Sequence, residues 1–268
     1  MVYLGSMELD LYQVDAFTSE VFGGNPACVM PLDDWLPDEV LLSLAQENAV
    51  AETAFLVADG DRYHLRWFTP DLEMDLCGHA TLASAHVVLF HLHPDRDQAI
   101  FETMSGTLVV TRSDKGYEMV LPNRYPESAV LPIEIQKAAN LPPLEVYKSR
   151  DYLLVYASKN DVEAWSVNRE MFDQINLGTG GVIVTAPGDD CDFVSRYFTP
   201  QATALEDPVT GSAHCSSAPF WAERLGKNQL HAKQLSARGG DIYCQVMPDH
   251  VRVSGAAVTY LRGKVGLD

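Results

Sequence analysis

Two short segments of the sequence place groups that could transfer protons next to small residues. Glu52 lies between the end of a candidate helix and a short apolar strand, in Glu52-Thr53-Ala54-Phe55. His79 follows Cys77-Gly78 at the start of a run of small and apolar residues. Carboxylates and imidazoles are common general acids and bases. Each residue also has a structural interpretation, a solvated loop carboxylate for Glu52 and a packed or capping histidine for His79.

A third segment, Asp207-Pro208-Val209-Thr210-Gly211-Ser212-Ala213-His214, combines further polar groups with a glycine. Asp207 is either a catalytic residue or the N-cap of a helix with proline in its first turn. Ser212 is a candidate site residue that could instead satisfy an early amide of the helix, and we interpret His214 as structural.

Gly78 and Gly211 begin the two candidate helices that carry these residues. Glycine lets backbone amides approach a ligand closely, and the amides at a helix N-terminus favour an anion. The two segments therefore predict a small anionic substrate. Asn25, which follows Gly23-Gly24, is interpreted first as a turn residue and second as a substrate-binding residue.

Cys77 could act as a thiolate, because a helix N-terminus lowers the pKa of a thiol. A racemase that uses two thiols would need a second cysteine at the matching position, where the sequence has Thr210, and Cys215 lies five residues further on. This disfavours a two-thiol mechanism. A racemase or epimerase that uses Cys77 with another base stays open.

The elements that would position these residues form an internal repeat. Arg66-Trp67-Phe68-Thr69-Pro70 is matched, 130 residues later, by Arg196-Tyr197-Phe198-Thr199-Pro200. Two further pairs of segments, starting at residues 52 and 105, match at offsets of 127 and 134. A period of about half the chain predicts two similar domains with a ligand cleft between them. At the offset of 127, Glu52 aligns with Thr179, so only the first half has an acid at this position. This favours a site with one base.

Most apolar runs are short and rich in β-branched and aromatic residues, which is typical of strands. The predicted strands are 8–14, 55–58, 63–68, 107–112, 117–121, 153–157, 182–185, 193–198, 242–247, 251–254 and 257–261. Helices are predicted at 37–47, 79–90 and 212–225, and the last two should be buried nearly all round. We therefore expect an α+β fold in which each half wraps a curved sheet round a central helix. The predicted domains are residues 7–122, completed by 256–268, and residues 123–255.

Composition excludes several classes of protein. The formal net charge of −18, without a basic tract, disfavours partnership with nucleic acid or a membrane surface. Five scattered cysteines without a C-x-x-C pair disfavour disulfides and structural zinc, and fit the cytoplasm. We expect no signal peptide or membrane span. Residues 1–6 precede a second methionine, Met7, and we interpret them as an added extension.

The ordered set of motifs resembles the phenazine-biosynthesis-like (PhzF-like) isomerase family, which has the diaminopimelate-epimerase-like fold. The sequence also lacks a Walker loop, G-x-G-x-x-G, H-E-x-x-H and G-x-S-x-G. The resemblance rests on the segments starting at Phe22, Glu52, Arg66, Cys77, Arg196, Glu206 and Gly239.

The resemblance implies a homodimer and an isomerisation without cofactor or metal. It places the catalytic carboxylate on Glu52, supporting polar groups on His79, Asp207 and Ser212, and substrate-binding amides on Gly78 and Gly211. It does not name the substrate. A non-catalytic protein that binds a small ligand stays open as an alternative.

Overall fold

The computed structural model describes residues 7–267, so the interpretation of residues 1–6 lies outside the described part of the chain. The chain divides into two compact units. The first contains the chain up to Met119 and the segment from Gly255 onward, and the second runs from Val120 to Ser254.

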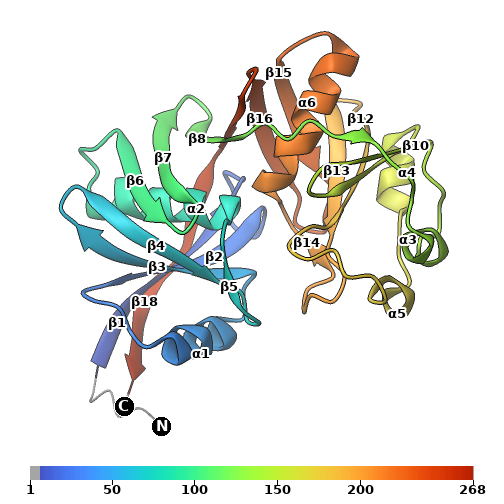
Figure 1. Cartoon of the computed structure of the whole chain (residues 1–268). Coiled ribbons are helices and arrows are strands. Elements are labelled where there is room, and N and C mark those ends of the chain that lie inside the picture. The colour runs from blue at the N-terminus through green and yellow to red at the C-terminus, as the bar shows by residue number, and fades with distance from the viewer. Residues whose placement is uncertain (1–6, 268) are drawn as a thin grey trace. The chain divides into compact units, whose positions relative to one another are not determined.

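The first unit is a mixed sheet with one long and one buried helix (Figure 1). Its strands are β1 (Met7–Ala16), β2 (Asn25–Leu32), β3 (Glu52–Asp59), β4 (Arg62–Phe68), β5 (Glu73–Met74), β6 (Gln98–Thr103), β7 (Gly106–Ser113), β8 (Gly116–Pro122) and β18 (Ala257–Leu267). Its helices are α1 (Asp38–Asn48), α2 (Gly78–His86) and the π-helical turn η1 (Val87–Leu92). The C-terminal strand β18 pairs antiparallel with β1 along the whole of β1.

The second unit repeats this plan. Its strands are β9 (Glu127–Ser128), β10 (Glu145–Lys148), β11 (Tyr152–Val155), β12 (Val182–Pro187), β13 (Phe193–Phe198), β14 (Glu206–Asp207), β15 (Gln229–Gln234), β16 (Gly240–Val246) and β17 (His250–Gly255). Its helices are α3 (Ile133–Ala138), α4 (Lys159–Ala164), α5 (Arg169–Phe172), the 3₁₀ turn η2 (Gly211–Ala213) and α6 (His214–Leu225).

Strand pairing shows that the repeat extends to topology. In the first unit β2 and β3 are parallel, β3 and β4 are antiparallel, and β4 pairs with both β5 and the parallel β6. In the second unit β11, β12, β13, β14 and β15 pair in the same way and with the same directions. The twin segments that start at Arg66 and Arg196 are the matching strands β4 and β13.

Each of these twin strands has the same arginine brace. Arg66 donates two hydrogen bonds to Glu73, at 2.6 and 2.7 Å, and Arg196 donates two to Glu206, at 2.7 and 2.8 Å. Bidentate arginine–carboxylate pairs fix orientation as well as distance. The brace ties β4 to β5 and β13 to β14, the strands that lead toward the two buried helices.

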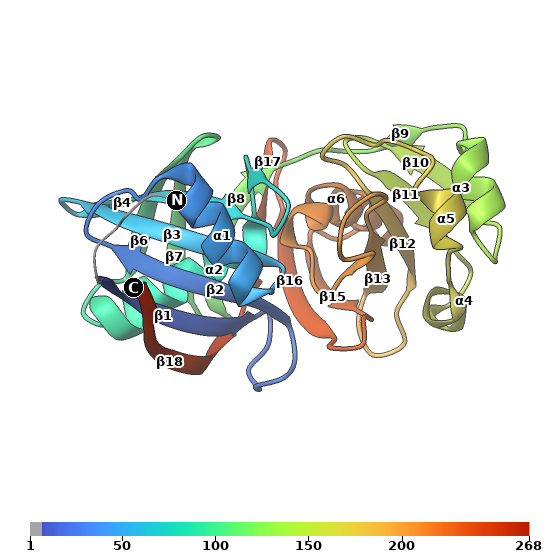
Figure 2. The ribbon, with the colours of Figure 1, turned by 90° about the horizontal axis from the view of Figure 1, so that it is seen from below.

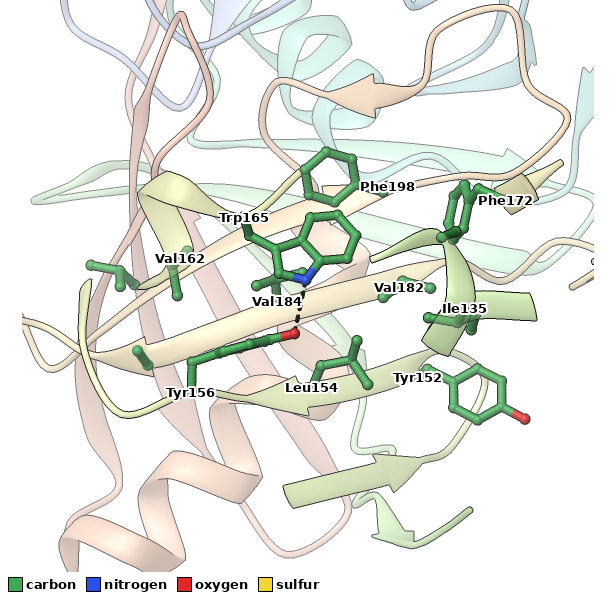
Figure 3. Close-up of a cluster of buried hydrophobic side chains, with 13 residues drawn as sticks. Ile135, Tyr152, Leu154, Tyr156, Val162, Trp165, Phe172, Val182, Val184 and Phe198 are labelled. Carbon is green, nitrogen blue, oxygen red and sulfur yellow. Dashed lines mark hydrogen bonds between the residues drawn. The ribbon is translucent and has the colours of Figure 1, made fainter. Parts of the chain in front are cut away.

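Helix α2 is buried at all nine positions. Its alanines, serine and glycine let the surrounding strands approach, and it packs against β1, β2, β3, β7 and β18. On another face of the sheet, α1 packs against β3 and β4 (Figure 2), where Leu41, Leu44 and Phe55 share one core. The second unit has a core of its own around Trp165, whose indole N–H donates to the hydroxyl of Tyr156 at 2.8 Å (Figure 3).

The predicted α+β class is confirmed, and so are the three predicted helices, with α2 ending at His86 and continuing as a π turn. The expectation that the helix at 212–225 is buried nearly all round was wrong for its last turn, because residues 222–225 are not buried. All eleven predicted strands exist, and β18 continues to Leu267. Strands β2, β6, β10 and β15 and the two-residue strands β5, β9 and β14 were not predicted. Among the described residues, no helix is long and apolar enough to cross a membrane.

Candidate functional site

Glu52 and His79 meet within the first unit. Glu52 is the first residue of β3, opposite Ala27 of the parallel strand β2, and His79 is the second residue of α2. Glu52 Oε2 lies 3.0 Å from His79 Nε2, and the side chains are 14% and 4% exposed. The contact is an ion pair when His79 is protonated. Glu52 is therefore withdrawn from solvent, unlike a loop carboxylate.

Cys77 occupies the N-cap of α2, with its Sγ 3.5 Å from His79 Nδ1. Burial and the neighbouring Glu52 raise the pKa of the Cys77 thiol to about 11, although His79 acts in the opposite direction. Burial alone would lower the pKa of His79, but the contact with the Cys77 sulfur and the negative charge of Glu52 outweigh burial and hold that pKa well above 6.5. The site therefore contains a neutral thiol and an imidazolium beside a carboxylate.

Glu52, Cys77 and His79 also offer three ligand atoms within 4.8 Å of one another. A zinc site takes four such ligands, or three with a water molecule. These residues could therefore bind a soft divalent metal ion, at the cost of the protons that His79 and Cys77 carry.

In the second unit, Asp207 belongs to β14 rather than to a helix. The alternative interpretation of Asp207 as an N-cap was wrong, because Thr210 holds that position before η2. Asp207 Oδ2 accepts a hydrogen bond from the Thr210 hydroxyl at 2.5 Å. Buried Gln234 donates to the Asp207 carbonyl at 2.8 Å and accepts from the Thr210 amide at 2.9 Å. Asp207 is thus fixed by its own segment and by β15.

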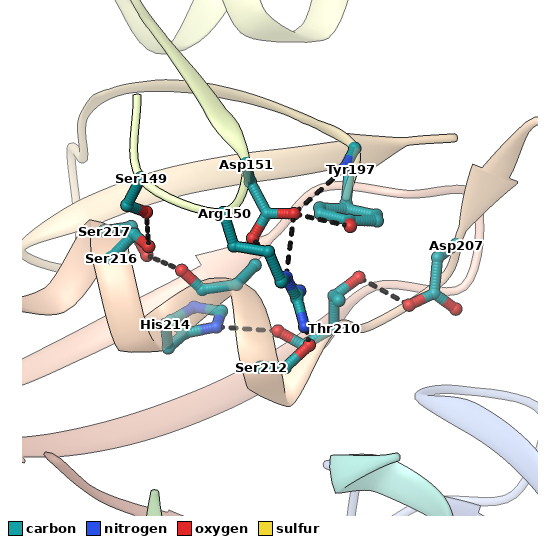
Figure 4. Close-up of polar contacts among 12 residues, drawn as sticks. Ser149, Arg150, Asp151, Tyr197, Asp207, Thr210, Ser212, His214, Ser216 and Ser217 are labelled. Atoms are coloured by element: carbon teal, nitrogen blue, oxygen red, sulfur yellow. Dashed lines mark hydrogen bonds and ion pairs between the residues drawn. The ribbon is translucent and has the colours of Figure 1, made fainter. Parts of the chain in front are cut away.

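Ser212 is the second residue of η2, and its Oγ accepts a hydrogen bond from Arg150 Nη2 at 3.1 Å. This contact is with a side chain rather than with one of the early helix amides that Ser212 could have capped. Arg150 is held in turn by Asp151, with the same Nη2 atom 3.0 Å from Asp151 Oδ2. Figure 4 shows this chain of contacts running from Tyr197 through Asp151 and Arg150 to Ser212.

The remaining candidates lie at element starts. Asn25 is the first, fully buried residue of β2, and Gly78 and Gly211 are the buried first residues of α2 and η2. His214 is fully buried, and burial lowers its pKa to about 4, against the opposing effect of the Thr210 carbonyl. Its Nδ1 lies 3.0 Å from that carbonyl oxygen, so the nitrogen carries the proton and the ring is neutral. This fits its structural interpretation.

The strand registers correct the matching of the two halves. Thr53 pairs with Phe68 in the first unit, as Val182 pairs with Phe198 in the second. The counterpart of Glu52 is therefore Gly181, and the expected match with Thr179 was wrong by two residues. Cys77 and Thr210 do match, since both are N-caps, and His79 matches Ser212.

Sequence reasoning missed Arg150, Asp151 and Gln234 as residues around the candidate site. Arg150 and Asp151 form an ordinary charged pair in a predicted loop, and Gln234 lies in an unpredicted strand. For Tyr197 a signal existed, because it replaces Trp67 in the twin segments.

The chain matches a model of a known protein family. A family model described as phenazine biosynthesis-like protein (PhzC-PhzF) matches residues 14–263. The chain belongs to this family. The predicted resemblance is confirmed.

Relatives agree in name and in structure. An uncharacterized isomerase of Pseudomonas aeruginosa is 45% identical over 263 residues, which cover 97% of this chain and all of that protein. A crystal structure of a PhzF-family protein from Enterococcus faecalis is 41% identical with a TM-score of 0.92, over 97% of this chain and all of that one. A hydroxyproline epimerase from Agrobacterium vitis shares the fold, with a TM-score of 0.61 at 9% identity over 97% of this chain and 93% of that one. The predicted epimerase-like fold is therefore confirmed.

Proposed function

We propose that this family member is a cofactor-independent isomerase that moves a proton on a small, carboxylate-bearing substrate, with Glu52 as general acid and base. The observation that carries the proposal is the Glu52–His79 pair, a carboxylate held 3.0 Å from a buried imidazole at the meeting point of β3 and α2. The description of relatives as isomerases supports it.

In the proposed reaction Glu52 removes a proton from a carbon next to an unsaturated group. The electron pair of the broken C–H bond shifts into that group, so the double bond moves and negative charge develops on the substrate. The protonated Glu52 then returns the proton to a different carbon. No redox change occurs, and product and substrate are isomers.

The other residues would bind the substrate and stabilise its developing charge. The His79 imidazolium places positive charge beside the reacting carboxylate. Asp207 and Ser212 would hydrogen-bond polar groups of the substrate. The backbone amides of Gly78 and Gly211 would bind its carboxylate, as free amides at helix starts do, with Asn25 in a supporting role.

The rival mechanism, a racemase that uses Cys77, is less well supported. General base catalysis works best when the pKa of the base lies near the working pH. The pKa of Cys77, about 11, leaves little thiolate at neutral pH.

The second alternative is a protein that binds a small ligand without catalysis. Such a protein would show no turnover with any compound of the panel.

Substitution of Glu52 tests the proposal. A panel of small unsaturated carboxylates is screened for isomerisation, and the active compound is assayed with Glu52→Gln. We expect kcat to fall by about 10²-fold or more, because acid–base catalysis contributes 10²–10⁴-fold in typical enzymes. Glu47→Gln, an exposed carboxylate on α1, is the matched control and should keep full activity. Full turnover by Glu52→Gln would refute the proposed role.

The expected homodimer and the expected cytoplasmic location stay predictions. Light scattering measures the molar mass in solution and so tests the homodimer.

A further inference from the structure

The second unit carries a different set of groups at the positions that correspond to Glu52 and His79. Gly181 replaces Glu52, and Ser212 replaces His79. A Cβ at Gly181 would lie 2.5 Å from Tyr197 Cζ and 2.6 Å from its Oη. Glycine therefore leaves the space that Tyr197 fills, and the second unit has no carboxylate at this position, which directly precedes β12.

Tyr197 and the Gly181 amide both donate to the buried carboxylate of Asp151, at 3.0 and 2.9 Å. Burial, together with the charge of Asp151, holds the pKa of Tyr197 well above 10, so its hydroxyl stays a donor. The Asp151 side chain is 1% exposed, and the Nε and Nη2 atoms of Arg150 also donate to its carboxylate. With the Tyr197 hydroxyl and the Gly181 amide, four donor atoms surround this carboxylate. A buried carboxylate with so many donors has one fixed orientation.

The turn that carries Arg150 and Asp151 is tied to the rest of the unit at its other end. Ser149 Oγ lies 2.6 Å from Ser216 Oγ of α6, and the Ser149 amide donates to the Asp151 carbonyl at 3.0 Å. The Arg150 guanidinium is therefore held between a fixed carboxylate and the start of η2. Its Nη2 atom serves both Asp151 and Ser212.

This geometry determines what Ser212 can do. Arg150 carries no acceptor, so in the 3.1 Å contact the guanidinium donates and Ser212 Oγ accepts. The Ser212 hydroxyl proton can then be donated to another group, and the adjacent cation strengthens it as a donor. A donor polarised by a partly buried cation fits an anionic oxygen better than a neutral one.

We infer that Arg150 is a positioning residue, which acts through Ser212 and makes the Ser212 hydroxyl a hydrogen-bond donor to a carboxylate or developing oxyanion of the substrate. This inference rests on the proposed function and adds that the two units have different roles in it. The first unit has the proposed proton-transferring carboxylate, Glu52, beside His79, and the second unit has a hydroxyl backed by a cation, Ser212, at the position that matches His79.

The test compares a carboxylate probe with its neutral analogue. Benzoate and benzamide are titrated into the full-length protein by calorimetry or NMR, with wild type, Ser212→Ala, Arg150→Gln, Arg150→Lys and the double variant Arg150→Gln/Ser212→Ala. Arg224→Gln is the matched control, because Arg224 pairs with Glu145 at a more exposed position of the same unit.

We expect wild type to prefer benzoate over benzamide. Arg150→Gln and Ser212→Ala should each weaken benzoate binding by about ten-fold or more, the size expected for a hydrogen bond to a charged group, with benzamide binding unchanged. The double variant should bind benzoate no more weakly than the single variant with the lower affinity. Arg150→Lys should restore part of the preference for benzoate over benzamide. Loss of a purely structural ion pair would weaken the binding of both probes equally.

Folding is monitored by thermal denaturation. Arg150→Gln leaves the Asp151 charge uncompensated, so Arg150→Gln/Asp151→Asn, which removes both charges, replaces it if the single variant does not fold. Benzoate binding at the wild-type level in Arg150→Gln, or a wild type that does not distinguish benzoate from benzamide, would overturn the inference. Neither readout uses turnover, so these failures are separate from a failure of the proposed role of Glu52.

Discussion

At the scale of single residues, the candidate site is defined by which groups carry charge. Burial penalises the charged form of both Cys77 and His79. Cys77 lies beside a carboxylate, which adds to that penalty, whereas His79 gains from the same carboxylate and becomes an imidazolium. The same neighbour thus keeps one side chain neutral and the other charged, which supports the proposed assignment of proton transfer to Glu52.

Cys77 should be unreactive and dispensable. Its pKa of about 11 predicts slow alkylation by iodoacetamide at pH 7.5, with a rate that increases about ten-fold per pH unit up to that pKa. Peptide mapping by mass spectrometry after timed alkylation measures this rate. Cys77→Ser should retain turnover within a few-fold. An alkylation profile with a midpoint below pH 8, together with loss of turnover in Cys77→Ser, would instead support the racemase mechanism.

The charge of His79 should make stability depend on pH. Its pKa in the folded protein lies above its value in the unfolded chain, so its contribution is fully present below about pH 6.5. That contribution is lost as the pH rises through the folded pKa. It amounts to about 1.4 kcal/mol for each pH unit by which the folded pKa exceeds the unfolded one. Urea denaturation at pH 6 and pH 9 measures it. In Glu52→Gln, which lacks the ion pair, the difference between the two pH values should shrink, and an unchanged difference would contradict the ion pair.

At the scale of elements, the beginnings of strands and helices position the site. Glu52 begins β3, His79 and Ser212 follow the first residues of α2 and η2, and Arg150 lies in the turn before β11. The braces Arg66–Glu73 and Arg196–Glu206 fix the strands that lead into these starts. The twin segments from which the repeat was recognised therefore serve the site indirectly, by holding its framework.

The Arg196 brace should be worth far more than a surface ion pair. Arg196 is 14% exposed and also donates to the carbonyls of Val162 and Trp165, at 3.1 and 2.7 Å. Arg196→Met leaves these acceptors and Glu206 without their donor, so we expect a loss of about 3–5 kcal/mol in the free energy of unfolding. Arg62→Met, which removes a pair that is 49% exposed on the arginine side, should cost less than about 1 kcal/mol. Equal losses in urea denaturation would contradict this role of the brace.

The elements also show what could and could not be predicted from the sequence. Period-two apolar runs such as Tyr63–Phe68 and the uniformly apolar run that forms α2 were recognised, because burial leaves a direct pattern. Strand β2 was missed because Pro26 and Pro31 lie within it, and proline usually argues against a strand. The match of Glu52 with Thr179 failed because the register depends on strand pairing. The network around Arg150 was missed because its partners lie up to 62 positions away in the sequence.

At the scale of the whole molecule, one topology occurs twice with different chemistry. Both units have a parallel strand pair, an arginine-braced hairpin and a buried helix in the same order. At the matching positions the first unit has Glu52 and His79, whereas the second has Gly181 and Ser212. The repeat thus supplies two equivalent frameworks, and of these matching positions only that of Glu52 holds a carboxylate.

The exchange of a carbon-bound proton with solvent is the decisive test of proton transfer by Glu52. The active compound is incubated with the protein in heavy water, and deuterium at carbon is followed by proton NMR and mass spectrometry. Product formed by the wild type should carry deuterium at the carbon that receives the proton, to the extent that Glu52 exchanges before reprotonation. Glu52→Gln should slow both exchange and isomerisation by about 10²-fold or more. Exchange at the wild-type rate in Glu52→Gln would show that another group moves the proton and would contradict the proposed mechanism.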